Sequence, residues 1–369
     1  MEKGGLFMNG KLAILVSDKK VRKLRNGKRA FSNETYEESA NSLHLQLYYV
    51  SIRDVTVENR SEVRAISYNY ENDEYVETKI SLPKVIYNRV SLKSKKNRQK
   101  VRHLHKQGYI VYNSFPFKNG KWLMYEMLKN DPELAKHLPK TVEANEENIK
   151  LMMTKFSKLF IKPCHSSIGK GIMYMERIEM DTWLLHYRDQ DQQWQETYFS
   201  TILPRILLEA ISSRPFIVQE TIPLATYEGR TFDTRVIVQR DQYGDWSITG
   251  MVGKLAQEGH SITNVGQGGD FADILTYLET NPHFTAQEIC QNIEELALRI
   301  ARYLEPYCYH IADLGMDIGI AVNGDLFFIE CNFRSQYAGM EKNTLLLDVC
   351  KNIFSNPIRY GSFLLRQTP

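Results

Sequence analysis

Residues 317–332 are the segment that most constrains how this chain can fold. They read Asp-Ile-Gly-Ile-Ala-Val-Asn-Gly-Asp-Leu-Phe-Phe-Ile-Glu-Cys-Asn, with an Asn-Gly pair between two apolar runs. Such a pair is a strong signal for a tight turn, so the segment predicts an antiparallel hairpin. Glu330 and Asn332 are two residues apart and therefore point to the same face of the sheet. We expect Asp317 to begin the partner strand and to face the same space.

The three side chains of this hairpin offer only oxygen ligands. Two carboxylates and an amide oxygen suit Mg²⁺, which proteins usually hold with a few carboxylates together with the phosphates of a substrate. The sequence therefore predicts a metal site made of Asp317, Glu330 and Asn332. The alternative is a surface hairpin whose polar ends are merely solvated.

A second segment, residues 160–175, predicts a phosphate-covering loop between two strands. Lys162 lies on the first strand, and a Ser- and Gly-rich turn follows it. Gly169 and Gly171 allow backbone N–H groups to turn toward an anion, and Ser166 and Ser167 add hydroxyl donors. No G-K-[ST] sequence opens a helix here, so this is not a Walker-type loop. The alternative is an ordinary hairpin turn with an exposed lysine.

Taken together, these segments resemble the ATP-grasp superfamily. Residues 216–223 are similar to its hinge strand, and residues 233–238 to the D-x-R strand of the branch that contains glutamate ligases and synapsins. Residues 119–122 and 138–141 resemble the lysine-headed helix and the P-x-T exit that open the ATP-binding module. Over residues 110–360 the chain most resembles the spore-coat-associated, YheC/YheD-like ATP-grasp family. That likeness rests on the sequences at 87–89, 121–122, 160–163 and 328–332.

The resemblance implies an α+β ATP-grasp fold, in which two α+β lobes grip ATP, preceded by a small α/β domain. It assigns nucleotide binding to Lys121, Lys162, Gln219, Glu220 and Ile222, beside the loop residues Ser166, Ser167, Gly169 and Gly171. It assigns catalytic roles near the phosphates to Arg235, Lys254 and Asn264. Arg89 follows a strand of the first domain, where ligands often bind, and Arg334 follows the metal-binding strand. We expect both arginines to contact the substrate.

The same resemblance implies a reaction. ATP and Mg²⁺ are the expected cofactors, and the substrates are a carboxylate and an amine joined through an acyl phosphate. Phosphoryl transfer of this kind needs positioning and charge neutralisation more than a protein nucleophile. Two alternatives remain open: a nucleotide-binding, spore-coat-associated structural protein with little catalysis, and an ATP-grasp kinase acting on a small molecule. The oligomeric state is left open.

Size and composition agree with a soluble globular protein. The chain has 369 residues, of which 43% are hydrophobic and 25% charged, enough for two or three compact units. We expect neither a membrane span nor a signal peptide. The five cysteines are scattered and form no C-x-x-C pair, so we expect a reducing, cytoplasmic location. The resemblance to the spore-coat-associated family adds an expected connection to the developing spore.

The net charge of +3 conceals an uneven distribution, because basic residues gather in the first 120 residues and the remainder is acidic. Residues 93–106 predict a basic helix, and residues 19–29 a basic loop. A solvated basic face is one interpretation; attraction of an acidic peptide or protein is the other. No recognised nucleic-acid-binding motif is present, so we expect no nucleic-acid partner.

Together with the periodicity and the turn signals, the resemblance implies that the chain has three parts. Residues 1–115 predict the N-terminal α/β domain, residues 116–222 the first ATP-grasp lobe with the phosphate-covering loop, and residues 223–369 the second lobe with the metal site. We expect a hairpin at 63–80 and helices at 35–46, 121–129, 146–155, 199–210 and 286–303.

Overall fold

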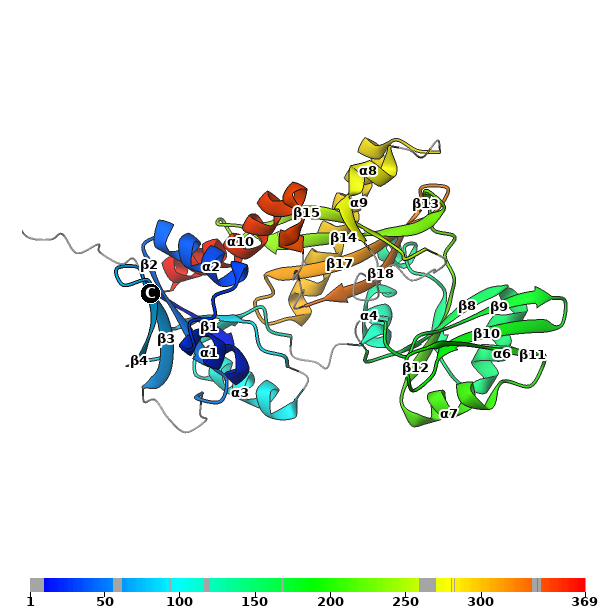
Figure 1. The fold of residues 1–369 in the computed structure, drawn as a ribbon, viewed down its shortest axis with the longest axis horizontal. Coiled ribbons are helices and arrows are strands. Elements are labelled where there is room, and N and C mark those ends of the chain that lie inside the picture. The colour runs from blue at the N-terminus through cyan, green and yellow to red at the C-terminus, as the bar shows by residue number, and fades with distance from the viewer. Residues whose placement is uncertain are drawn as a thin grey trace, which may run out of the picture.

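The described strands form three six-stranded sheets that follow one another along the chain (Figure 1). The fold comes from a computed structural model. It describes residues 10–55, 62–92, 94–115, 120–166, 169–258, 270–279, 281, 283–333, 337 and 340–368. The first sheet and the second lie at opposite ends of the molecule, and the third lies between them. This mixture of sheets and helices confirms the predicted α+β class.

The first sheet has the order β4-β3-β2-β1-β5-β6. Its parallel strands are β1 (Gly10–Val16), β2 (Leu45–Ser51), β5 (Val85–Asn88) and β6 (Ile110–Tyr112), and the predicted hairpin supplies β3 (Val63–Asn69) and β4 (Glu74–Ile80). Leu12 and Ile14 face one core, and Ala13 and Leu15 face the other, so β1 is buried on both sides. Continuous apolar runs of this kind are typical of covered parallel sheets.

Helices α1 (Asp18–Arg25), α2 (Phe31–Ser42) and α3 (Lys95–Lys106) belong to this domain. The predicted basic loop at 19–29 is wrong, because most of it is helix α1. The Ser17 side chain caps that helix by accepting a hydrogen bond from the Lys20 amide, and Val21 and Leu24 are buried. A capping serine followed by apolar residues three apart was therefore the signal that the basic composition concealed.

The second sheet has the order β11-β10-β9-β8-β12-β7. Its strands are β7 (Thr141–Glu143), β8 (Lys158–Pro163), β9 (Met173–Glu179), β10 (Thr182–Arg188), β11 (Trp194–Phe199) and β12 (Phe216–Glu220). Helices α6 (Glu146–Lys155) and α7 (Arg205–Ser213) pack on one face around a separate core. The predicted helix at 199–210 began too early, since Phe199 ends β11 and α7 starts only after Pro204.

The third sheet has the order β16-β15-β14-β17-β18, with β13 paired to β14. Its strands are β13 (Thr226–Tyr227), β14 (Arg230–Arg240), β15 (Trp246–Leu255), β16 (Asp270–Asp273), β17 (Asp313–Ile320) and β18 (Leu326–Asn332). The predicted hairpin is β17–β18, and Gly324 takes φ +89° in its turn, as glycine readily does. Asp317 does not begin its strand, however: β17 starts four residues earlier, at the buried Asp313.

One face of the third sheet carries most of its apolar core. Helix α9 (Ala286–Leu304) covers this face, together with α4 (Lys121–Leu128), α5 (Pro132–Ala135) and α8 (Ile274–Leu278). Met124, Leu128 and Leu134 belong to this core, so α4 and α5 pack with the third sheet although the sequence division groups them with the second. The short 3-10 turns η2 (Glu305–Tyr307), η3 (Met340–Lys342) and η4 (Thr344–Leu346) complete the connections.

Helix α10 (Leu347–Gln367) joins the first sheet to the third (Figure 1). Gly361 lies so close to Leu12 and to the Tyr112 hydroxyl that an added Cβ would come within 2.8 Å of both. Pro357 lies inside the helix and has no N–H to offer the Ile353 carbonyl. Gln239 of β14 takes over that role and donates to this carbonyl at 2.9 Å. Neither α10, with its 21 residues, nor any other described helix is long and apolar enough to cross a membrane.

Replacing Gln239 with Met should destabilise the protein by roughly 1–3 kcal/mol, because the Ile353 carbonyl would lose its donor in a buried setting. Denaturant unfolding followed by circular dichroism gives this free energy. Gln242→Met, at an exposed position nearby, is the matched control and should change it by less than about 0.5 kcal/mol. Equal stabilities of the two variants would show that the Gln239 contact does not hold α10 in place.

Candidate active site

Four charged side chains form a row on the face of the third sheet opposite α9. Asp233 and Arg235 are two apart on β14, and the register places Lys254 of β15 opposite Asp233 and Asp317 of β17 opposite Arg235. Directly opposed residues share a face, so the sheet itself brings the four together. Lys254 Nζ lies 2.9 Å from Asp233 and 3.0 Å from Asp317. Arg235 donates to both carboxylate oxygens of Asp317, with Nη2 at 2.9 Å from Oδ2.

The row is balanced in charge although it is buried. Burial opposes ionisation of Asp317, but Arg235 and Lys254 outweigh it and hold the pKa of that carboxyl well below its usual range. Burial likewise opposes the charge on Lys254, but Asp233 and Asp317 raise the pKa of its ammonium group above the usual value. Asp317, Arg235 and Lys254 are therefore charged at neutral pH. Removing one partner would leave an uncompensated buried charge, which is strongly destabilising.

The three predicted metal ligands lie next to one another on β17 and β18. Asp317 is paired with Glu330, and Asn332 donates from Nδ2 to Glu330 Oε1 at 3.1 Å. Ile329 is an extra residue in β18, because the pairing passes from Asp317–Glu330 to Ile318–Phe328. Among the described residues no group of three or more His, Cys, Asp or Glu is placed to hold a metal ion. Two carboxylates with one amide are instead the set that Mg²⁺ shares with phosphate oxygens, so the residues fit a nucleotide-bound Mg²⁺.

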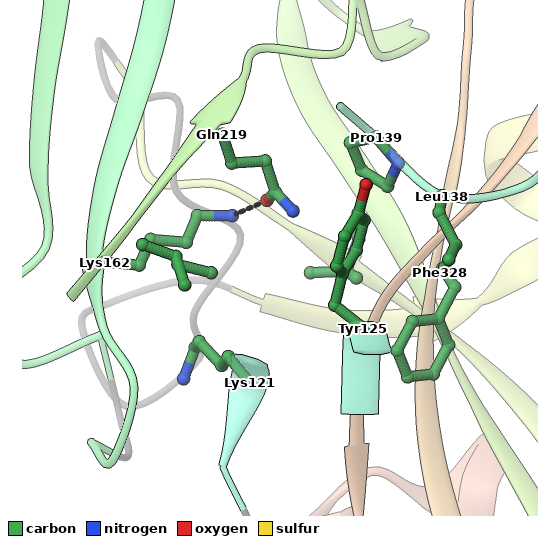
Figure 2. Close-up of a pocket in the computed structure, with 9 residues that line it drawn as sticks. Lys121, Tyr125, Leu138, Pro139, Lys162, Gln219 and Phe328 are labelled. Atoms are coloured by element: carbon green, nitrogen blue, oxygen red, sulfur yellow. Dashed lines mark hydrogen bonds between the residues drawn. The ribbon is translucent and has the colours of Figure 1, made fainter. Parts of the chain in front are cut away.

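Two lysines meet between the second and third sheets. Lys121 begins α4 and lies 3.5 Å from Glu330 Oε2, and its Nζ donates to the Ser166 carbonyl at 3.4 Å. Lys162 of β8 donates to Gln219 Oε1 at 2.6 Å (Figure 2). Burial and then the neighbouring charge of Lys121 lower the pKa of Lys162 to about 8. Two cations held this close suit the phosphates of a nucleotide.

A narrow, mostly apolar slot adjoins these lysines (Figure 2). The following residues line it together with Lys121 and Lys162: Tyr125, Leu138, Pro139, Ile217, Gln219, Phe328 and Ile329. Flat apolar walls with a few polar groups are typical of small-molecule sites. Of the predicted hinge residues, Gln219 lines the slot. Glu220 accepts from the Lys140 amide at 2.6 Å, and the Ile222 carbonyl accepts from the Leu224 amide at 2.9 Å.

The Ser- and Gly-rich loop contributes three of its four predicted residues to the described structure. Gly169 and Gly171 have φ of +66° and +75°, values that favour glycine, as expected for a loop that turns its amides. The Ser166 hydroxyl is buried and has no hydrogen-bond partner within the described part of the chain. A buried hydroxyl in this state is ready to donate to a ligand oxygen. Ser167 lies outside the described residues.

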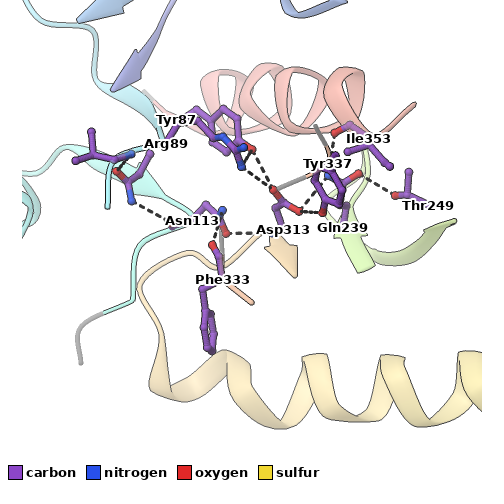
Figure 3. A network of polar contacts seen from close by, with 11 residues as sticks. Tyr87, Arg89, Asn113, Gln239, Thr249, Asp313, Phe333, Tyr337 and Ile353 are labelled. Carbon is purple, nitrogen blue, oxygen red and sulfur yellow. Dashed lines mark hydrogen bonds and ion pairs between the residues drawn. The ribbon is translucent and has the colours of Figure 1, made fainter. Parts of the chain in front are cut away.

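Arg89 lies on the same side of the third sheet as the charged row, but beside the start of β17. Its Nη1 lies 3.4 Å from Asp313 Oδ2 and 3.4 Å from the Tyr87 hydroxyl (Figure 3). Asp313 precedes Asp317 by four residues on β17, which separates them by about 13 Å along the strand. Tyr337 donates to Asp313 as well, at 2.9 Å. Arg334 and Asn264 lie outside the described residues.

Sequence reasoning missed several residues of this region. Asp313 was not singled out, although it lies four residues before Asp317 on the same face of β17 and interrupts an apolar run. No ligand contact was predicted for Tyr125, Phe328 or Ile329, and only the packing of α4 against β18 shows that they line the slot. The bulge at Ile329 had no sequence signal that we can identify.

Comparison with solved structures identifies the fold. The chain is similar to the macrocyclase MdnC of Microcystis aeruginosa, crystallised with its precursor peptide MdnA, at 13% identity and a TM-score of 0.51, over 93% of this chain and 97% of that one. It is similar to the VanG D-Ala:D-Ser ligase of Enterococcus faecalis at 14% identity and a TM-score of 0.54, over 96% and 99% of the two chains. Likeness at this identity shows the fold alone, and that fold is the ATP-grasp fold.

Sequence comparison then gives the family. The YheC/D-like ATP-grasp model matches residues 109–364, and the chain belongs to that family. Two relatives come from Bacillus subtilis strain 168 and are named endospore coat-associated proteins. YheD is 23% identical over 263 residues, or 69% of this chain and 57% of YheD; YheC is 19% identical over 286 residues, or 74% and 76%. The chain thus spans little more than half of the length of YheD. The predicted family resemblance is confirmed.

Replacing Lys162 with Met should stabilise the protein at pH 7 by roughly 1–3 kcal/mol. The pKa of Lys162 is lowered to about 8, so the folded protein binds this proton less tightly than the unfolded chain does. The charged lysine therefore costs stability below about pH 8. That cost disappears as the pH rises from about 8 through the pKa of an unfolded lysine.

Denaturant unfolding of wild type and Lys162→Met at pH 7 and pH 10 measures the effect, and the difference between the two proteins should shrink at the higher pH. Lys170→Met, at an exposed lysine eight residues away, is the control and should change stability by less than about 0.5 kcal/mol. A loss of stability in Lys162→Met at pH 7 would contradict the lowered pKa assigned to Lys162.

Proposed function

We propose that this protein is an ATP- and Mg²⁺-dependent carboxylate–amine ligase that works through an acyl phosphate. The observation that carries the proposal is the placement of two lysines, from α4 and β8, opposite the charged row of the third sheet. A triphosphate between them would meet cations from both lobes, and the slot beside Lys162 would take its base. This geometry supports ATP binding between the lobes, as the fold implies.

The two substrates would react in two steps. A carboxylate oxygen attacks the γ-phosphorus, the bond from that phosphorus to the bridging oxygen of ADP breaks, and an acyl phosphate forms. An amine nitrogen then attacks the acyl carbon and loses a proton, and inorganic phosphate leaves. Both steps move negative charge between oxygens, so electrostatic stabilisation is the protein's main task.

The residues of the site would divide this task. Lys121 and Lys162 would neutralise the phosphates, with the Ser166 hydroxyl and the amides around Gly169 and Gly171 as further donors. Asp317 engages Nε and Nη2 of Arg235, and this contact fixes the plane of the guanidinium group, whose Nη1 carries further donors for the transferring phosphoryl group. Lys254 holds the two aspartates of the row in place.

Asp317, Glu330 and Asn332 would hold Mg²⁺, which neutralises phosphate charge when bound. Asn264 and Arg334 keep the roles that the sequence predicts, which are a catalytic role near the phosphates and a contact with the substrate. We retain the division into residues 1–115, 116–222 and 223–369, with α4 and α5 packed against the last part.

The acceptor or donor is proposed to be an acidic peptide or protein. Helix α3 contains six lysines and arginines and no acid, so the N-terminal domain presents a basic surface. Arg89 would fix a substrate carboxylate at the inner edge of that domain. MdnC, which shares the fold, was crystallised with a precursor peptide, in keeping with a polypeptide substrate. The coat-associated names of YheD and YheC favour one other candidate, a nucleotide-binding protein of the spore coat with little catalysis.

Glu330→Gln removes one charge from the metal site without changing side-chain volume. We expect turnover of Mg²⁺-ATP to fall by a factor of roughly a hundred or more, the scale reported for loss of one electrostatic group at a reacting phosphate or oxyanion. Coupled measurement of ADP release, with thermal unfolding as a check of the fold, decides the outcome. Glu294→Gln, on the exposed side of α9, should leave turnover unchanged. Normal turnover in Glu330→Gln would contradict the assignment of Glu330 to the metal site.

The reaction itself leaves a chemical trace. With a panel of amino acids and acidic peptides, a productive carboxylate should stimulate ADP release, and hydroxylamine should trap the acyl phosphate as a hydroxamate. Oxygen-18 in the substrate carboxylate should appear in the released phosphate. Stimulated ATP hydrolysis that yields a stable phosphorylated product and neither trace would move the protein to the kinase class. Nucleotide binding without stimulation by any carboxylate would favour the structural alternative.

A further inference from the structure

The side chains of Thr141 and Gln219 form a hydrogen-bonded pair at the edge of the nucleotide slot. Thr141 begins β7, Gln219 lies on β12, and the antiparallel register places them directly opposite each other. Both are buried, at 2% and 7% exposure. Gln219 Nε2 donates to Thr141 Oγ1 at 2.8 Å. Cross-strand neighbours of this kind hold each other in one rotamer.

A third group fixes which member of this pair donates the hydrogen bond and which accepts it. Thr141 donates its only hydroxyl proton to the Pro139 carbonyl at 2.8 Å. Its oxygen can then act only as an acceptor toward Gln219, so the amide of Gln219 must present Nε2 to Thr141. The other end of the amide, Oε1, consequently faces the slot and accepts from Lys162 at 2.6 Å (Figure 2). The orientation of the amide thus follows from the hydrogen bonds around it.

We infer that Thr141 is a positioning residue that locks Gln219 as a hydrogen-bond acceptor toward the base, and that this lock makes the site select adenine over guanine nucleotides. The inference rests on the proposed function, because it takes the slot to hold the base of a nucleotide triphosphate. In the structure, Lys162 donates a hydrogen bond to Oε1 of Gln219. Once Lys162 contacts the phosphates, Oε1 is offered to whatever lies between Ile217, Phe328 and Ile329.

The chemistry of the two purines explains the selection. Adenine carries an amino group at the position where guanine carries a carbonyl oxygen. An acceptor held in place accepts a hydrogen bond from the amino group of adenine. When guanine enters, the same acceptor faces a carbonyl oxygen, and no hydrogen bond can form between the two oxygens. If the amide could turn, its Nε2 would meet the guanine oxygen and the discrimination would be lost. Rejection by a polar group that cannot adapt is a strong source of specificity.

Thr141→Val tests the lock, because valine has the shape of threonine and lacks the hydroxyl. Calorimetric titration with the non-hydrolysable analogues AMPPNP and GMPPNP, each with Mg²⁺, gives the ratio of their dissociation constants. We expect the preference for the adenine analogue to fall about tenfold in Thr141→Val, the scale of one hydrogen bond to a buried group. Thr141→Ser keeps the hydroxyl and should retain the wild-type ratio. An unchanged ratio in Thr141→Val would overturn the inference.

Gln219→Glu provides a test that does not depend on the folding of Thr141→Val. A carboxylate has acceptors at both oxygens and needs no lock, so this variant should keep the adenine preference at or above the wild-type ratio. A Gln219→Glu variant that prefers the guanine analogue would also overturn the inference. If wild type binds neither analogue, the proposed function fails and this inference falls with it. Wild-type binding with equal ratios in wild type and Thr141→Val overturns this inference and leaves the proposed function standing.

Discussion

The contact between Asp317 and its two cations governs the arrangement of the site. Arg235 and Lys254 come from two other strands, and both reach the same carboxylate. Their attraction keeps Asp317 ionised in a buried position, where a carboxyl without partners would take up a proton. The contact therefore fixes the place of the β17 carboxylate and the plane of the arginine. Glu330 and Asn332 gain their positions from the pairing of β18 with that same strand.

The charged row lies where it does because α10 covers only part of the sheet face. Along β14 the residues on this face are Asp233, Arg235, Ile237 and Gln239, and the last two lie under α10. Ile237 packs in the core that α10 shares with the first sheet, and Gln239 satisfies the carbonyl that Pro357 leaves without a donor. The other half of this face holds the buried charged side chains of the row. A single strand thus packs under α10 at one end and carries the charged row at the other.

Much of this arrangement was predictable from local sequence patterns. The Asn323–Gly324 turn between apolar runs predicted the β17–β18 hairpin, and the order of the motifs predicted the ATP-grasp fold; both are confirmed. Helix α10 was not predicted, because Pro357 and several polar residues interrupt its apolar periodicity and only the Gln239 contact accommodates the proline. Asp313 and the slot residue Tyr125 were missed for a similar reason. Their roles depend on which elements meet in space, and no local pattern records that. The assigned roles of the site residues stay predictions.

The extra residue at Ile329 decides which face of the sheet the following side chains of β18 take. In β18 the buried residues are Leu326, Phe328 and Cys331, so their spacing changes from two to three at the bulge. Both Ile329 and Glu330 consequently lie on the ligand side, one lining the slot and the other beside Lys121. Strict alternation along β18, with Ile329 kept but not bulged, would continue the pattern that Leu326 and Phe328 set. Glu330 and Asn332 would then point into the apolar core, and Cys331 would take the place of a ligand.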